Sequence, residues 1–320
     1  MKNIWNTLEK PFLVQAPMED VTDTVFRQII AKCGKPDVFF TEFTNVEGMC
    51  SRGRDKVGRR LIFTPVEKPI VAQIWGLDPS KFFETAKMVK DMGFDGIDIN
   101  MGCPEKSVVK RGACAGLIHN PTLAKEIIEA VKKGAGDLPI SVKTRIGIKE
   151  IETEVWIEFL LKQNLDALTV HGRTVKEMSD VPAHWDEIGK VVKLRDKLNV
   201  NTLIIGNGDI KSLDDALEKH KKYKVDGIMI GRGIFENLWI FDKKINPQNI
   251  SSEAKLKLLI EHIKLFDKTW GSASRRTKNF SLMKKFYKIY ISSRPDASDL
   301  RMKLMGFNNA KNTLDYLKTI

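Results

Sequence analysis

The sequence predicts an α/β fold: a (β/α)8 TIM barrel followed by a small all-helical C-terminal domain. Eight short β-rich apolar runs alternate with segments of helical spacing over roughly the first 245 residues, the size of such a barrel. The first run is followed by Ala16–Asp20, which lacks the glycine-rich turn that often marks the rival fold, a doubly wound open sheet. After Phe241 only helical periods remain, so a second, helical domain is expected.

The runs share β-branched and aromatic residues and end at polar or glycine-containing loops. In chain order they are Phe12–Gln15, Val38–Thr41, Ile70–Ile74, Gly96–Asn100, Ile140–Lys143, Ala167–Val170, Leu203–Gly206 and Gly227–Ile230. Helices are expected at Asp23–Lys32, Pro79–Met92, Pro121–Lys133, Glu152–Gln163 and Leu213–Lys221, among others. Strands that alternate with helices pair in parallel, so these runs predict one parallel sheet.

The C-terminal part begins after a polar linker, Asp242–Ser252. Two apolar stripes with helical spacing follow, and they predict three or four helices. The stripes are Leu256, Leu259, Ile260, Ile263 and Phe266, and then Leu282, Phe286, Ile289 and Tyr290. We therefore predict a barrel domain over residues 1–243 and a helical domain over residues 250–320.

Composition limits the function classes. The 320 residues are 42% hydrophobic and 29% charged, as in ordinary globular proteins, and no run reaches the length of a membrane helix. The polar start has no signal-peptide apolar run, and four cysteines without a CxxC pair disfavour a disulfide scaffold or a structural zinc site. We expect a cytoplasmic protein without a metal or a membrane partner. The sequence leaves the oligomeric state open, with a monomer expected.

Charge is concentrated at the C-terminal end. The formal net charge is +12, and residues 246–320 hold 15 Lys and Arg against 6 Asp and Glu. A basic surface of this kind favours a polyanionic partner such as nucleic acid, although solubility alone also explains it.

Active groups of such barrels lie at the C-terminal ends of the strands, and polar or glycine-rich residues follow six of the eight runs. The last two loops, Gly206–Asp209 and Gly231–Gly233, predict a phosphate site. Their glycines let backbone amides approach an anion, and Arg232 adds a charged fork. Simple tight-turn chemistry is the alternative.

Three side chains at strand ends suit a flavin ring. Lys143 needs a partner for its charge, and a reduced flavin carries negative charge near N1. Gln73 offers both a donor and an acceptor to a ring edge. His171 would contact the ring, the phosphate or the substrate, unless it is a satisfied core histidine.

Cys103 is the candidate catalytic residue, because it lies in a turn at a strand end between Gly102 and Pro104. An ordinary thiol titrates near ~8.5, so at neutral pH it is mostly protonated and can donate a proton. We interpret Cys33 and Cys114 as structural and assign no role to Cys50.

These motifs together resemble the tRNA-dihydrouridine synthases. The resemblance is carried by Ala16-Pro17-Met18, Asn100-Met101-Gly102-Cys103-Pro104, Lys106, Lys143-Thr144-Arg145, His171-Gly172-Arg173-Thr174, Asn207-Gly208-Asp209-Ile210 and Gly231-Arg232-Gly233. It implies that FMN takes a hydride from NADPH and passes it to C6 of a uracil in tRNA, while Cys103 protonates C5. The residues implied to hold FMN are Pro17, Met18, Gln73, Lys143, His171, Asn207, Gly208, Asp209, Gly231 and Arg232.

The resemblance also implies contacts to tRNA. Asn100 and Arg145 would face the uridine, Lys106 would extend the contact, and the basic and aromatic C-terminal helices would hold the backbone. Arg275, Arg276, Lys278 and Glu42 are similar to the subgroup that modifies position 16 of tRNA. The loop Met178–Pro182 departs from the family, which often has Tyr-Gly before the Trp-Asp pair. An amphipathic helix with a solvated basic face is the alternative for the C-terminal charges.

Two other functions remain open. One is an FMN barrel oxidoreductase acting on a small molecule, such as a dihydroorotate dehydrogenase, which would not need the basic C-terminal surface. The other is a non-catalytic RNA-binding protein, which would not need Cys103 and Lys143.

Overall fold

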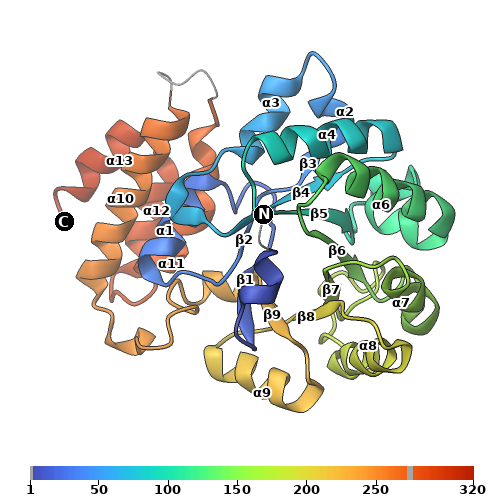
Figure 1. Ribbon diagram of the computed structural model, residues 1–320. Helices are drawn as coiled ribbons and strands as arrows, with labels where there is room; N and C mark the ends of the chain where they lie inside the picture. The colour runs from blue at the N-terminus through green and yellow to red at the C-terminus, as the bar shows by residue number, and fades with distance from the viewer. Residues whose placement is uncertain (1–2, 272–276) are drawn as a thin grey trace.

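The computed structural model describes residues 3–271 and 277–320. Within them nine parallel strands surround a central axis, with helices outside (Figure 1). The strands are β1 (Phe12–Gln15), β2 (Phe39–Phe40), β3 (Thr44–Asn45), β4 (Ile70–Trp75), β5 (Gly96–Met101), β6 (Ile140–Arg145), β7 (Ala167–His171), β8 (Leu203–Asn207) and β9 (Gly227–Ile230).

The sheet closes on itself. Its order is β1-β9-β8-β7-β6-β5-β4-β2, and a bridge between Val14 and Val38 joins the two ends. β3 pairs with the end of β4, where Thr44 lies opposite Ile74. The (β/α)8 barrel is therefore confirmed, and the open sheet is wrong because its two edges would not meet.

Each predicted run overlaps one strand of the structure, and most of these strands extend past the end of the predicted run. β6, β7 and β8 continue through Arg145, His171 and Asn207, whose polar side chains hide the strand end from an apolar pattern. β3 was missed because its two residues, Thr44 and Asn45, are polar and too few to form an alternation.

The outer helices follow the strands, and all except α3 and α5 bury apolar residues. They are α1 (Thr24–Cys33), α2 (Val46–Met49), α3 (Arg54–Gly58), α4 (Pro79–Asp91), α5 (Lys106–Lys110), α6 (Pro121–Ala135), α7 (Thr153–Leu161), α8 (Trp185–Leu198) and α9 (Leu213–Tyr223). Side-chain caps fix their starts: Asp23 Oδ1 accepts from the Phe26 amide at 3.1 Å, and Asn120 Oδ1 from the Leu123 amide at 3.1 Å.

Inside the barrel, apolar side chains from alternating strand positions fill the axis. Phe12, Val14, Phe40 and Met229 belong to this inner cluster. Gly227 makes room for it, because a Cβ there would lie 2.2 Å from the Phe12 ring. The barrel is thus a packed core below its C-terminal rim.

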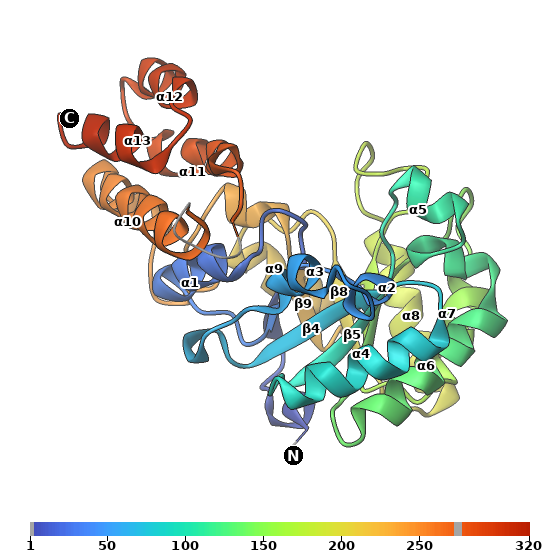
Figure 2. The same ribbon diagram turned by 90° about the horizontal axis from the view of Figure 1, so that it is seen from above.

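The C-terminal helices are α10 (Ser252–Trp270), α11 (Tyr287–Ile291), α12 (Ala297–Gly306) and α13 (Ala310–Leu317), with a 3-10 segment at Phe280–Phe286. α10 packs against α1, and the ring of Phe286 in the 3-10 segment lies 4.6 Å from that of Phe26; α12 and α13 pack on α11 and α10 (Figure 2). Seen from above, these helices lie on the side of the barrel away from the N-terminus, as does α5. The second predicted stripe is divided between the 3-10 segment and α11.

Among the described helices, none has the length and apolar character of a membrane span.

Candidate active site

A cavity of about 820 Å³ opens at the C-terminal ends of β1, β6, β7, β8 and β9. Nine of the ten residues predicted to hold FMN line it; Gln73 is the exception. The nine are Pro17, Met18, Lys143, His171, Asn207, Gly208, Asp209, Gly231 and Arg232. The structure thus gathers residues that lie more than 200 positions apart in the chain, although their role in binding a cofactor stays a prediction.

Strand register explains this gathering. Arg145 pairs with His171, and His171 pairs with Asn207, so the last residues of β6, β7 and β8 stand in one row. In a parallel sheet such a row lies at one level of the rim. Asn207 is fixed there because its Nδ2 donates to the Met229 carbonyl at 2.9 Å.

One end of the cavity is strongly cationic. Arg173, which is buried, donates from Nη2 to both carboxylate oxygens of Asp209, at 2.7 and 2.6 Å. The exposed Arg232 donates to Asp209 Oδ1 at 3.1 Å. Partial burial acts to raise the pKa of Asp209, but these arginines and the Ala183 amide hold it below its usual value. Arg173 was assigned no role from the sequence, although it lies within the His171–Thr174 motif.

Positive charges in the cavity also shift the pKa of His171. Burial lowers its pKa well below the usual value, and the positive charges of Lys143, Arg145, Arg173 and Arg232 lower it further. Arg173 Nη1 lies 3.2 Å from His171 Nε2. Because a guanidinium only donates, Nε2 must accept and the proton sits on Nδ1. The imidazole is therefore neutral, and the four cations that act on it favour an anionic ligand at this end of the cavity.

Lys143 reaches the cavity from β6. Its side chain is partly open to the cavity but otherwise surrounded by protein, and burial together with the charge of Arg145 lowers its pKa to about 8. Asp98 attracts it from a distance, but among residues 3–271 and 277–320 no hydrogen bond or salt bridge holds its ammonium group. Because the Lys143 ammonium group has no direct partner and lies beside an open cavity, it is suited to bind the electron-rich edge of a ring.

The Cys103 turn is built by a chain of polar side chains behind the rim. Asn100 Oδ1 accepts from the amides of Gly102, at 3.0 Å, and Cys103, at 2.9 Å. Asn100 Nδ2 donates to Gln73 Oε1 at 3.0 Å, and Gln73 Nε2 donates to Asp98 Oδ2 at 2.8 Å. Gln73 and Asn100 are buried, and neither lines the cavity. Both therefore shape the turn, and their direct contacts to FMN and to the uridine stay predictions.

Cys103 lies beside Pro104, which does line the cavity. Its thiol is more acidic than expected: a hydrogen bond with Cys114 lowers its pKa to about 7, against a smaller effect of burial. Arg145 connects this turn to the loop after β7. Its Nε donates to the Gly102 carbonyl at 3.0 Å, and its Nη1 to the carbonyls of Thr174, at 2.8 Å, and Met178, at 3.1 Å.

That loop, which departs from the family pattern, forms one wall of the cavity. The wall consists of Met178, Ser179, Asp180, Val181 and Pro182. Arg173 Nε donates to the Val181 carbonyl at 2.6 Å, so the arginine that holds Asp209 also anchors the loop.

The residues predicted to contact tRNA lie in different environments. Lys106 is exposed at the start of α5. Lys278 is buried, and its Nζ donates to Asp23 Oδ2 at 3.1 Å and to Glu42 Oε2 at 3.2 Å, so its predicted contact with tRNA has no support from its position. Glu42 is buried with it. Arg275 and Arg276 lie outside the described residues.

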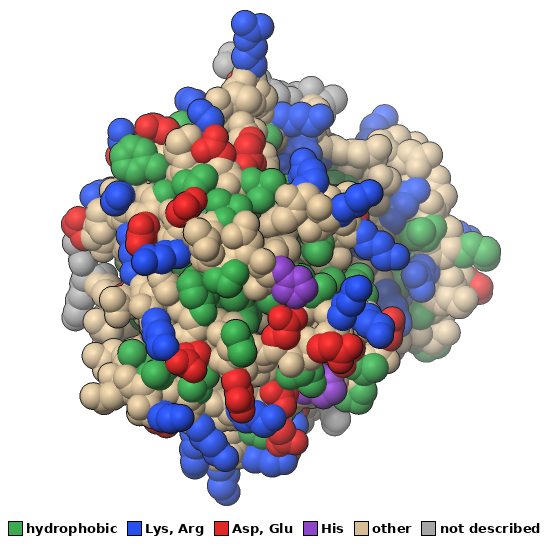
Figure 3. Space-filling model, turned by 90° about the vertical axis from the view of Figure 1, so that its right-hand side faces the viewer, with side chains coloured by type: hydrophobic (Ala, Val, Ile, Leu, Met, Phe, Trp, Pro, Cys, Tyr) green, Lys and Arg blue, Asp and Glu red, His purple; other side chains and the backbone are tan. Residues whose placement is uncertain are grey.

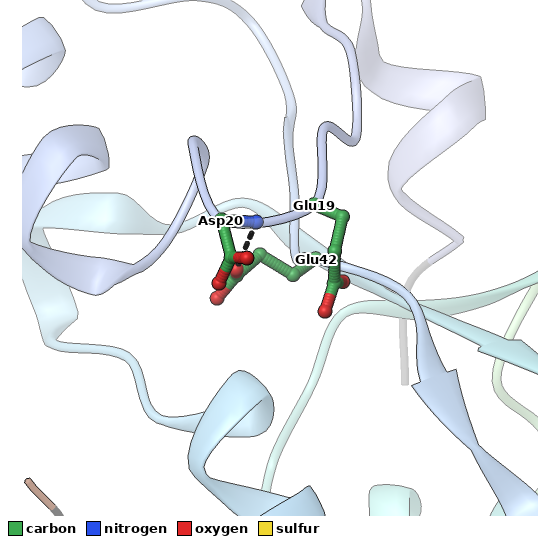
Figure 4. A group of neighbouring side chains, drawn as sticks. All are labelled: Glu19, Asp20 and Glu42. Atoms are coloured by element: carbon green, nitrogen blue, oxygen red, sulfur yellow. Dashed lines mark hydrogen bonds between the residues drawn. The ribbon is translucent and has the colours of Figure 1, made fainter. Parts of the chain in front are cut away.

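Glu42 belongs to an acidic group with Glu19 and Asp20, drawn in Figure 4. The Asp20 amide donates to Glu42 Oε1 at 2.8 Å, and Arg60 binds Glu19. Burial raises the pKa of Glu42 to about 7, against the attraction of Lys278. Lys278 and the Asp20 amide thus bind the Glu42 carboxylate, and Arg60 binds that of Glu19. On the side of the barrel away from α10, by contrast, basic and acidic side chains are interspersed (Figure 3).

Known proteins with similar folds include morphinone reductase, with a TM-score of 0.54 and 11% identity over 75% of this chain and 87% of that one. Histamine dehydrogenase from Rhizobium sp. 4-9 has a TM-score of 0.56 and 16% identity, over 85% of this chain and 50% of that one. At these identities the likeness supports the barrel fold alone.

Sequence relatives are much closer. A protein of Staphylococcus epidermidis named probable tRNA-dihydrouridine synthase is 46% identical over 99% of this chain and 96% of its own length. Probable tRNA-dihydrouridine synthase 2 of Bacillus subtilis is 45% identical over 98% and 94%. The family described as dihydrouridine synthase matches residues 14–320, which include the barrel, the Cys103 turn and the C-terminal helices. The chain belongs to the dihydrouridine synthase family of enzymes.

Proposed function

We propose that this protein is a tRNA-dihydrouridine synthase that uses FMN and NADPH to reduce the C5–C6 bond of a uridine in tRNA. The observation that carries the proposal is a cavity with a cationic end, an ammonium group without a direct partner in its wall, and an acidic thiol at its edge. Membership of the family and the names of the relatives support the reaction class.

The cavity residues fit FMN in charge and shape. Arg173, Arg232 and the backbone of Gly208 would hold the phosphate. Gly208 has a φ of 138°, and a Cβ there would lie 2.5 Å from the Ala183 side chain. Lys143 would lie against the ring, where its charge stabilises the electron-rich form. When bound, FMN supplies the hydride that C6 of the uracil receives, and NADPH restores it.

Cys103 supplies the proton. Its S–H bond breaks as a C–H bond forms at C5, and the electron pair stays on Sγ, so the cysteine is not oxidised. A pKa of about 7 places the thiol near the operating pH, where a general acid is most effective. Arg145 and Asn100 keep the turn in place through the Gly102 carbonyl and the Cys103 amide.

The tRNA must present a uracil at the rim, which requires turning the base out of its stack. Contacts to the surrounding backbone offset that cost, and the C-terminal domain carries the basic excess that such contacts need. Lys106 extends the basic surface beside the rim. We therefore propose that residues 1–243 carry the chemistry and residues 250–320 bind tRNA in the cytoplasm.

Two measurements test the proposal. A yellow purified protein whose released cofactor runs as FMN in chromatography supports the flavin, whereas a colourless protein that fails to bind added FMN contradicts it. Purified enzyme with NADPH and unmodified tRNA transcript should then produce dihydrouridine, measured by mass spectrometry of digested nucleosides. Sequencing the product for its dihydrouridine position tells whether position 16 is the target.

The two alternatives give other results. A small-molecule oxidoreductase would oxidise NADPH yet leave every tRNA uridine intact. A non-catalytic RNA-binding protein would bind the transcript without NADPH oxidation.

A further inference from the structure

Asp98 is a fully buried carboxylate below the Cys103 turn that the proposed reaction does not use. It faces the barrel axis: Val71 belongs to the inner cluster, Gln73 follows two positions later on the same face of β4, and Asp98 pairs with Gln73 across the sheet. A buried charge is costly unless it is hydrogen-bonded. We therefore expect donors at both oxygens of Asp98.

Both oxygens of Asp98 do accept hydrogen bonds, from the two neighbouring strands. Ser141 Oγ on β6 donates to Oδ1 at 2.6 Å, and Gln73 Nε2 on β4 donates to Oδ2 at 2.8 Å. Burial raises the pKa of Asp98 to about 6, against the lowering effect of these donors and of the charge of Lys143. Above that pH the carboxylate only accepts, so each hydrogen-bonding atom that faces it must be a donor.

This requirement fixes the direction of a chain of side-chain amides. Gln73 turns Nε2 to the carboxylate, which leaves its Oε1 to accept from Asn100 Nδ2 at 3.0 Å. Asn100 therefore turns Oδ1 to the backbone amides of Gly102, at 3.0 Å, and Cys103, at 2.9 Å. Backbone amides only donate, so they require the same orientation of Asn100 that Asp98 imposes from the other end. Every hydrogen bond of the chain thus points toward the carboxylate.

We propose that Asp98 is a positioning residue for Cys103: as the last acceptor of this chain it fixes both side-chain amides and, through them, the turn that holds the thiol at the edge of the cavity. The inference rests on the proposed function, in which that thiol protonates C5 of the uracil. No bond forms or breaks at Asp98. If Gln73 flipped, Asn100 would flip with it and present Nδ2 to the two amides of the turn, so donors would face donors.

Amide exchange measured by NMR in the full-length protein tests this without FMN, NADPH or tRNA. Labelling with ¹⁵N-cysteine gives four amide signals, from Cys33, Cys50, Cys103 and Cys114, and the signal missing from Cys103→Ala identifies that of Cys103. The Cys103 amide donates to Asn100, so its exchange with water reports whether the turn is held. In the wild type it should exchange at least about ten-fold more slowly than in the urea-unfolded chain. An unprotected amide would overturn the proposal.

Variants compared at pH 8, where Asp98 is ionised, separate the acceptor from packing and charge. Asp98→Leu keeps the side-chain shape but accepts nothing, so the Cys103 amide should exchange at least about five-fold faster, as the loss of one hydrogen bond requires. Asp98→Asn loses the charge but keeps an acceptor for Gln73, so exchange should stay within about two-fold of the wild type. Ser141→Ala is the matched control: it removes only the other donor to Asp98 and should also stay within about two-fold.

Three results would overturn the proposal: equal exchange in the wild type and Asp98→Leu, an equal increase in the leucine and asparagine variants, or an increase as large in Ser141→Ala. The Cys33 amide, at the end of α1, is the folding control and should exchange alike in every variant. If Asp98→Leu does not fold, Gln73→Met replaces it. Methionine has a similar length and donates nothing, so it interrupts the chain at the next residue and should give the same increase.

The rate of dihydrouridine formation links the chain to the reaction. Asp98→Leu should lower it at least about ten-fold, because a misplaced thiol no longer meets C5, and Asp98→Asn should largely restore it. An unchanged rate in Asp98→Leu despite faster exchange would overturn the positioning role. A wild type that forms no dihydrouridine, with the exchange effects present, would reject the proposed reaction and keep the hydrogen-bond chain. Dihydrouridine formation without any exchange effect would reject the chain alone.

Discussion

Removing Lys278 should destabilise the contact between the barrel and the C-terminal helices. Its side chain is 2% exposed, and its ammonium group lies between Asp23 Oδ2 and Glu42 Oε2, whose side chains are 10% and 1% exposed. Breaking a buried ion pair by deleting one partner costs about 3–5 kcal/mol. Both carboxylates keep another donor, the Trp270 Nε1–H at 2.8 Å for Asp23 and the Asp20 amide for Glu42. We therefore expect Lys278→Ala to lower the free energy of unfolding by about 3 kcal/mol at pH 8.

The pH dependence of this loss has a definite sign. Burial raises the pKa of Glu42 from 4.5 to about 7, so between these values the folded protein binds more protons than the unfolded chain. Wild-type stability from this group therefore falls as pH rises through that window. Without Lys278 the pKa of Glu42 rises further, because an attraction that lowers it is gone. The destabilisation by Lys278→Ala should thus be smaller at pH 5.5 than at pH 8.

Urea denaturation at both pH values measures this effect. Lys285→Ala is the matched control. Lys285 is exposed, and within residues 3–271 and 277–320 its Nζ donates only to the Asp20 carbonyl, at 2.9 Å, so less than about 0.5 kcal/mol should be lost. Adding Glu42→Gln to Lys278→Ala should recover part of the loss, because it removes one uncompensated charge. A loss below about 1 kcal/mol at pH 8, or one that does not change with pH, would refute the reasoning.

Further predictions concern the thiol, the cationic end and the barrel axis. Uridine reduction should fall as pH rises through about 7, because Cys103 must be protonated to act as the acid; a rate constant that is flat to pH 9 in steady-state assays would contradict this. Arg173→Lys should lower FMN affinity at least ten-fold in fluorescence titrations, because a lysine cannot make the bidentate contact that positions Asp209. Unchanged affinity would exclude the cationic end of the cavity as the phosphate site. Gly227→Ala should cost about 1–3 kcal/mol of stability in urea, because its Cβ meets the Phe12 ring, whereas Gly306→Ala, with open space around it, should cost nothing.

Much of the fold and of the candidate site could be predicted from the sequence, because the apolar patterns that mark strands end at polar residues. In a parallel barrel all strand ends share one rim, so Lys143, His171 and Asp209 could be placed together without knowing the register. The register itself depends on packing among distant segments. The sequence therefore predicts Gln73 at a ring edge but does not show that its side chain accepts a hydrogen bond from Asn100.

The errors concern contacts between distant residues. Lys278 fits a basic and aromatic pattern, but its partners Asp23 and Glu42 lie more than 230 positions earlier. The acidity of Cys103 depends on a thiol eleven residues later, which a turn brings back to it. Arg173 could have been found, because it lies in a motif that was recognised, two residues after His171.

The central claim is that this cavity reduces uridine in tRNA with a proton from Cys103. Its most direct test is mass spectrometry of nucleosides after purified protein acts on unmodified tRNA with FMN and NADPH, comparing wild type with Cys103→Ala. The wild type should form dihydrouridine, and the variant should keep its flavin and its NADPH oxidation while dihydrouridine falls by at least about a hundred-fold. Equal dihydrouridine from both proteins would contradict the role of Cys103, and none from either would contradict the proposed reaction.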